Sequence, residues 1–136
     1  MIETRGAAMR QVAVVAALAL TLLLVLMAGT AGAHKRIVET NLQLKLDPSG
    51  NTVLPLSGKL TSERDRCEGG RTVNVTVNGA LVATTTTLVN GDWFAQLSPR
   101  PAKGTTLIAS TPGKFLKRST KHRHKCASDF AERRVP

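Results

Sequence analysis

The chain has 136 residues, with 19 Lys and Arg against 9 Asp and Glu, a net charge of +10 and two cysteines. This length suits one domain with or without a targeting segment, and it is too short for a TIM barrel or a two-lobed nucleotide enzyme. Two cysteines exclude a cysteine-only zinc site and a disulfide-dense scaffold, and a hydrophobic content of 42% argues against wholesale disorder.

The first 33 residues differ in composition from the rest of the chain. Arg5 and Arg10 precede a stretch from residue 11 to residue 33 that contains no charged side chain and is rich in Ala, Val and Leu. A charged start, an apolar middle and a small-residue end are typical of a secretory signal peptide. We therefore predict a signal-peptide helix within residues 1–33.

Small residues also indicate where this segment ends. Ala31 and Ala33 occupy the two positions that a signal peptidase requires to be small, so cleavage is expected after Ala33. The remaining residues, 34–136, would form a single exported domain with 17 Lys and Arg and 8 Asp and Glu, because only Arg5, Arg10 and Glu3 are removed. The alternative is an uncleaved membrane anchor, since the uncharged stretch is long enough to span a bilayer.

Alternation of apolar and polar residues dominates the chain after residue 33. This period of two is typical of strands with one face on a core and one face in water. No segment there has a convincing helical period. The predicted strands are 42–46, 54–60, 73–77, 81–88, 93–97, 104–110 and a last run from near Cys126 toward Val135.

Two Asn-Gly dipeptides punctuate these runs. Asn78-Gly79 separates the third and fourth strands, and Asn90-Gly91 repeats the strand–turn–strand order before Trp93. Asn-Gly between two such runs predicts a hairpin, because both turn positions tolerate a positive φ. Six or seven short strands with turns at roughly ten-residue spacing predict an all-β fold, an antiparallel sandwich.

Cys67 and Cys126 are the only cysteines, and both follow the predicted signal peptide. Export places them where thiols oxidise, so we predict one structural disulfide. A redox or metal-binding pair is the alternative, but no C-x-x-C spacing supports it.

A resemblance to a known family is carried by residues 57–62, Cys67, 71–75, 84–87, 90–94 and 126–128. These segments resemble bacterial prealbumin-like domains, a group that includes carboxypeptidase regulatory-like and Cna-B-type sandwiches with an Ig-like architecture. The resemblance implies a non-catalytic secreted module and transfers no catalytic residue.

The densest charge lies in residues 114–125, which hold six Lys and Arg, two His and no acid. We expect an exposed connection before the last strand, where such a cluster would attract anionic cell-wall polymers, anionic lipids or another envelope protein. A solvated loop that only maintains solubility is the alternative. Phe115 is the only aromatic residue in the cluster, so no stacking platform for nucleic acid is expected. The candidate anion-binding residues are Lys114, Lys117, Arg118, Lys121, Arg123 and Lys125.

His122 and His124 would share one side of a strand and could reach one metal ion. The neighbouring cations oppose metal binding, and only His34 offers a third imidazole, so we expect no metal and no cofactor. The three histidines also lack an orienting carboxylate in sequence, which disfavours a Ser-His-acid enzyme. We therefore expect a non-catalytic binding or structural module of the cell envelope or extracellular space. The alternative is an electrostatic binder of anionic polymers or membrane surfaces through residues 114–125.

Overall fold

The computed structural model describes residues 34–117 and 122–136. Strands make up nearly all of the regular structure there, and η1 (Asp65–Cys67), a 3-10 helix, is the one helical element of these residues. None of the described helices is long and apolar enough to cross a membrane. The predicted signal-peptide segment, residues 1–33, lies outside the described residues.

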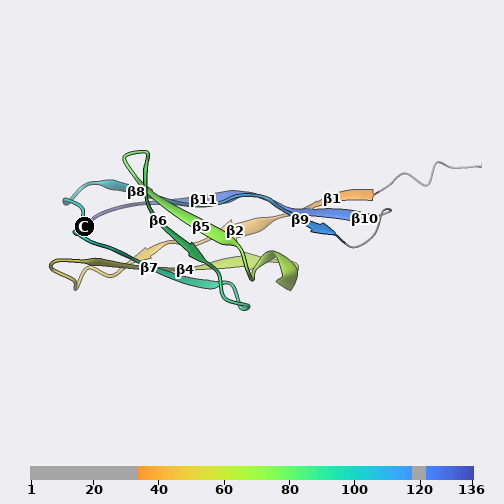
Figure 1. Cartoon of the computed structure of the whole chain (residues 1–136), viewed down its shortest axis with the longest axis horizontal. Helices are drawn as coiled ribbons and strands as arrows, with labels where there is room; N and C mark the ends of the chain where they lie inside the picture. The colour runs from red at the N-terminus through yellow and green to blue at the C-terminus, as the bar shows by residue number, and fades with distance from the viewer. Residues whose placement is uncertain (1–33, 118–121) are drawn as a thin grey trace, which may run out of the picture. The chain divides into compact units, whose positions relative to one another are not determined.

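One four-stranded antiparallel sheet forms the first layer of a sandwich (Figure 1). The central strands pair through Val75 and Ala109, and the outer strand β11 pairs with β8 from Thr111–Asp129 to Thr106–Arg134. The strand order is β11 (Asp129–Arg134), β8 (Thr106–Thr111), β5 (Thr72–Val77) and β6 (Ala80–Thr86).

The second layer is built around one long strand, β4 (Leu54–Ser62). Strand β7 (Asp92–Leu97) pairs with one of its edges, and the short strands β2 (Thr40–Leu42) and β3 (Lys45–Leu46) pair with the other. All of these pairings are antiparallel. The sequence run 42–46, predicted as one strand, is therefore interrupted between β2 and β3.

The core lies between the two layers, and we call these layers together the sandwich body. Alternation turns every second side chain of the strands inward, as the sequence pattern predicts. Trp93 packs over Gly58, where a Cβ would overlap both the indole and the Gln43 carbonyl. The buried cluster comprises Leu42, Leu44, Leu54, Leu56, Leu60, Val73, Val75, Trp93, Leu97, Leu107, Ala109 and Val135.

A third sheet extends from one end of the sandwich body, and we call it the end sheet. It consists of β1 (His34–Val38), β10 (His122–Cys126) and β9 (Lys114–Lys117), with β10 in the centre. Strand β1 pairs with β10 in parallel, and β9 pairs with β10 antiparallel. The register of β9 with β10 continues that of β8 with β11, so the two pairs form one long hairpin that belongs to both regions.

The all-β, sandwich-like architecture is confirmed for the described residues, and its pairings are antiparallel except for that of β1 with β10. The prediction of six or seven strands was too low, because the described residues form eleven. The hairpin predicted at Asn78-Gly79 is also confirmed: both residues have positive φ, at 50° and 83°, and Val77 pairs with Ala80. The turn at Asn90-Gly91 forms as well, with Gly91 at a φ of 84°.

That second turn does not close a hairpin, however. Strand β6 lies in one layer and β7 in the other, so the chain crosses between layers at this point. The Gly91 carbonyl accepts a hydrogen bond from the Leu60 amide at 2.9 Å, which holds the turn against β4. A turn dipeptide specifies local φ angles but not which strand will pair with the next one.

The exposed connection predicted over residues 114–125 is wrong for most of its length. Residues 114–117 and 122–126 are strands β9 and β10 of the end sheet, and residues 118–121 lie outside the described residues. Cys126 ends β10 rather than opening the last strand, which starts at Asp129. Strand β1 was not predicted, because its sequence, His-Lys-Arg-Ile-Val, groups the basic and the apolar side chains instead of alternating them.

Candidate anion-binding site

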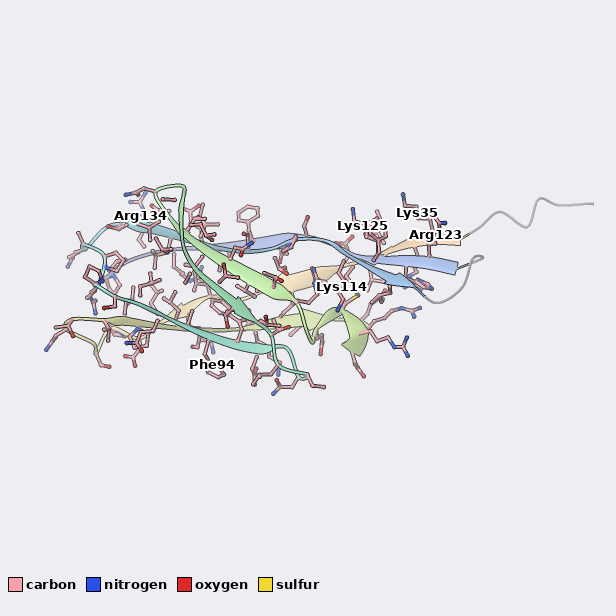
Figure 2. The ribbon with its side chains drawn as sticks, viewed as in Figure 1. Lys35, Phe94, Lys114, Arg123, Lys125 and Arg134 are labelled. Atoms are coloured by element: carbon pink, nitrogen blue, oxygen red, sulfur yellow. A yellow bond between two sulfur atoms is a disulfide. The ribbon has the colours of Figure 1, made fainter. Side chains whose placement is uncertain are left out.

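The end sheet separates the basic cluster into two faces, because neighbouring residues of a strand point to opposite sides. Among the described side chains, the outer face carries Lys35, Ile37, Phe115, Arg123 and Lys125. The inner face carries Arg36, Val38, Lys114, Leu116, His124 and Cys126. Figure 2 shows Lys35 and Lys125 on one side of this sheet and Lys114 on the other.

The register arranges the outer face as two rows across three strands. In one row Ile37 lies beside Lys125, and Lys125 lies beside Phe115. The ammonium group of Lys125 is 5.2 Å from the centre of the Phe115 ring, a distance that suits a cation–π contact. In the other row Lys35 lies beside Arg123, which takes the register position opposite Lys117.

Cations of the inner face are engaged within the molecule. Arg36 donates to the Glu63 carboxylate at 2.7 Å, and both side chains are about half exposed. The ammonium group of Lys114 lies 3.5 Å from the Gly70 carbonyl oxygen. The inner face also covers a small buried cluster of Val38, Cys67 and Cys126, against which Leu116 packs.

Cations of the outer face differ from these, as far as the described residues are concerned. In the part of the chain that the structure describes, no carboxylate lies within ion-pair distance of Lys35, Arg123 or Lys125. The three strands themselves contain no Asp or Glu. Like charges directly opposite each other on neighbouring strands destabilise a sheet. The outer face is therefore an uncompensated cationic surface that an external anion would stabilise.

A disulfide fixes the end sheet to the sandwich body. Cys67 of η1 and Cys126 of β10 are bonded, with a sequence separation of 59 and 5.5 Å between their Cα atoms. Both cysteines are fully buried. The predicted disulfide is thus present in the structure.

Arg71 stabilises the same junction, where the end sheet joins the sandwich body, by hydrogen bonds. Its side chain is only 1% exposed, and no carboxylate pairs with it among the described residues. Burial lowers the pKa of the Arg71 guanidinium. The guanidinium instead donates to three backbone carbonyls, those of Cys67 at 2.9 Å, Pro112 at 2.7 Å and Ala127 at 2.8 Å. These carbonyls lie at η1 and at the two breaks where the long hairpin passes from body to end sheet.

The structure brings together only part of the predicted site. Arg123 and Lys125 share the outer face, whereas Lys114 lies on the inner one, and Lys117 is placed by its register position alone. Arg118 and Lys121 lie outside the described residues. His34 and His122 are register partners and His124 pairs with Arg36. No group of three metal-ligating side chains occurs among the residues described.

Sequence reasoning missed Lys35 and Ile37 of this face. Each lies 88 residues from its register partner in sequence, and only the parallel pairing of β1 with β10 places them beside Arg123 and Lys125. The buried role of Arg71 was missed as well. No local signal distinguishes it from an exposed arginine at the start of a strand.

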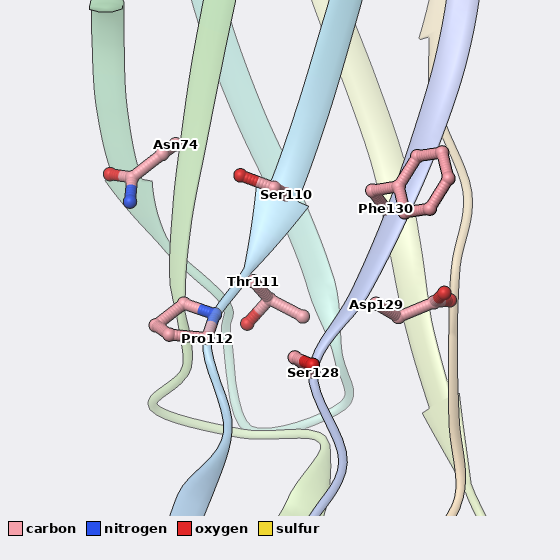
Figure 3. A pocket seen from close by; sticks show the side chains of 7 residues that line it. All are labelled: Asn74, Ser110, Thr111, Pro112, Ser128, Asp129 and Phe130. Atoms are coloured by element: carbon pink, nitrogen blue, oxygen red, sulfur yellow. The ribbon is translucent and has the colours of Figure 1, made fainter.

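A separate hollow of about 480 Å³ lies on the outer surface of the first layer, near the junction (Figure 3). The Asp129 carboxylate at its edge accepts a hydrogen bond from the Leu42 amide at 2.7 Å, so it helps to hold strand β2. The hollow is lined by Asn74, Ser110, Thr111, Pro112, Ser128, Asp129 and Phe130 and contains no histidine.

No protein-family model matches this chain, and comparisons with curated proteins and with solved structures likewise find no match.

Proposed function

We propose that the protein is a non-catalytic, exported binding module that captures polyanions through the outer face of its end sheet. The observation that carries the proposal is the segregation of cations between the two faces. Arg36, on the inner face, is paired with Glu63, whereas Lys35, Arg123 and Lys125 on the outer face have no carboxylate partner among the described residues. A surface that lacks internal compensation favours a partner of opposite charge.

Export is the second part of the proposal. The composition of residues 1–33 favours a signal peptide that is cleaved after Ala33, which would leave residues 34–136 as a single domain. The Cys67–Cys126 disulfide is consistent with an extracytoplasmic location, because such bonds persist in oxidising compartments. We assign the domain to the prealbumin-like and carboxypeptidase regulatory-like sandwiches as part of the same proposal, on the strength of the segments that resemble them.

The test uses the full chain, expressed with its own N-terminal segment and purified with its disulfide oxidised. The variant Lys35→Gln/Arg123→Gln/Lys125→Gln removes three positive charges from the outer face. Retention on heparin resin, a soluble polyanion, is then compared at low and at physiological ionic strength. We expect the wild type to be retained at low salt and the variant to elute much earlier, because electrostatic binding weakens as salt screens the charges.

A matched control removes the same charge elsewhere. Lys103→Gln/Arg133→Gln/Arg134→Gln changes three exposed cations of the sandwich body, and Figure 2 shows Arg134 far from the end sheet. The control should elute close to the wild type. Equal losses in the two triple variants would mean that net charge alone governs retention, and retention of the outer-face variant would overturn the proposal.

A further inference from the structure

We propose that the polyanion recognised by the outer face is the surface of an anionic phospholipid bilayer, into which Ile37 and Phe115 insert between the lipid headgroups. This inference rests on the proposed function, because it uses the same cations. It adds the two apolar side chains, which a soluble polyanion would leave in water.

The first argument is the position of the apolar side chains. Ile37 is 57% exposed and Phe115 is 62% exposed, and they lie on the two sides of Lys125 in one row of the outer face. Exposed apolar side chains on this scale are costly in water and are stabilised when a partner covers them. A bilayer interface offers an apolar layer directly beneath its charged headgroups, so it accommodates both kinds of side chain at once.

The second argument is the mode of contact that the cations allow. Lysine and arginine can lay their aliphatic stems along an apolar surface while the charged end remains at the headgroup level. On this face a cation and an apolar side chain are already neighbours, because the Lys125 ammonium group lies 5.2 Å from the centre of the Phe115 ring. The neighbouring row, Lys35 and Arg123, has the same orientation and can contact further phosphates.

The third argument is the place of the end sheet in the chain. His34, the first residue of β1, directly follows the apolar segment predicted to engage the membrane during export. Strand β1 is therefore the first part of the exported domain, in sequence, after the segment expected to engage a bilayer.

The experiment measures binding of the oxidised full chain to phosphatidylcholine vesicles with and without phosphatidylglycerol. The readout is the ratio of binding to anionic and to neutral vesicles, because a retained apolar segment would bind both alike. Ile37→Ser/Phe115→Ser keeps every charge, and we expect it to lower this ratio about tenfold while heparin retention stays unchanged. The outer-face charge variant should lower the ratio about a hundredfold, at about fivefold for each cation.

Phe130→Ser serves as the matched control for the apolar variant. Phe130 is 65% exposed, but it lies on β11 of the sandwich body beside Asp129. Its replacement should leave the vesicle ratio unchanged. Insertion is measured separately with Phe115→Trp, since the native Trp93 is buried and gives a constant background. Its emission should shift to the blue with anionic vesicles, and that of Phe130→Trp should not.

The outcomes separate this inference from the proposed function. If Ile37→Ser/Phe115→Ser binds anionic vesicles as well as the wild type does, the bilayer inference is wrong and capture of soluble polyanions stands. Heparin retention without any preference for anionic vesicles leads to the same conclusion. If the outer-face charge variant binds both heparin and anionic vesicles like the wild type, both proposals fail.

Discussion

The sandwich body and the end sheet share the same long hairpin, but different forces hold them in place. The body encloses twelve buried apolar residues between two layers. The end sheet is a single layer, and its buried cluster consists of Val38, Cys67 and Cys126 with Leu116 against it. Its attachment depends on the disulfide and on Arg71 instead. Because only one face of the end sheet is needed for that attachment, the other face is available to carry charge and exposed apolar side chains.

Removal of the disulfide should have the largest effect on the stability difference between the two regions. Cys67→Ala/Cys126→Ala should lower the free energy of unfolding by about 4 kcal/mol, since the bond closes a loop across 59 residues and so restricts the unfolded chain. The loss of stability should appear first as local opening of the end sheet, which has little apolar burial of its own. Hydrogen exchange should therefore accelerate at the amides of β1 and β10 more than at those of β5 and β8.

Leu60→Ala provides the control for that measurement. Leu60 is fully buried in the core of the body, and its truncation should cost about 2–5 kcal/mol. Its effect on exchange should extend over the body strands rather than concentrate in the end sheet. If the double cysteine variant and Leu60→Ala gave the same exchange pattern, the two regions would form one cooperative unit and the comparison would be wrong.

Arg71 gives the next largest effect. Arg71→Met fills a similar volume but leaves the carbonyls of Cys67, Pro112 and Ala127 without their donor, which should cost about 3 kcal/mol. Arg71→Lys keeps the charge but loses the planar fork that reaches three acceptors, so it should recover only part of that loss. Urea unfolding measures both variants.

The exposed residue Arg134 supplies the reference for these two variants. Arg134→Met removes an arginine from the surface of β11 and should change stability little. If Arg71→Met were as stable as Arg134→Met, the three hydrogen bonds would contribute nothing to the junction.

The strands of the body could be predicted from the sequence because local patterns specify them. Alternating apolar residues mark β4, β5 and β7, and Asn78-Gly79 fixes the hairpin between β5 and β6. The disulfide could be predicted because an exported chain is expected to meet an oxidising compartment and only two cysteines are present. These features depend on neighbours in sequence or on composition, which a single sequence displays.

The end sheet could not be predicted in the same way. Its strands β9 and β10 are so rich in cations that they are typical of a solvated loop, and their order depends on pairing with distant β1 and on Cys126. The candidate site was consequently predicted as a cluster without faces. Register across three strands, which no local pattern specifies, distinguishes Arg123 and Lys125 from Lys114.

The smallest expected effect compares the two faces of the end sheet through two neighbouring residues, Arg36 on the inner face and Lys35 on the outer face. Arg36→Gln removes the ion pair with Glu63 and should lower stability by about 0.2–1 kcal/mol, as expected for a half-exposed pair. Lys35→Gln removes a like charge beside Arg123 and should raise stability by about 0.2–1 kcal/mol. Both changes in stability should shrink in high salt.

The total charge provides the control. Each variant lowers the net charge of +10 by one unit, so general repulsion alone predicts a gain in stability for both. Opposite signs in urea unfolding at low salt would follow only from the different surroundings of the two faces, and equal signs would mean that total charge, rather than its placement, governs this end of the molecule.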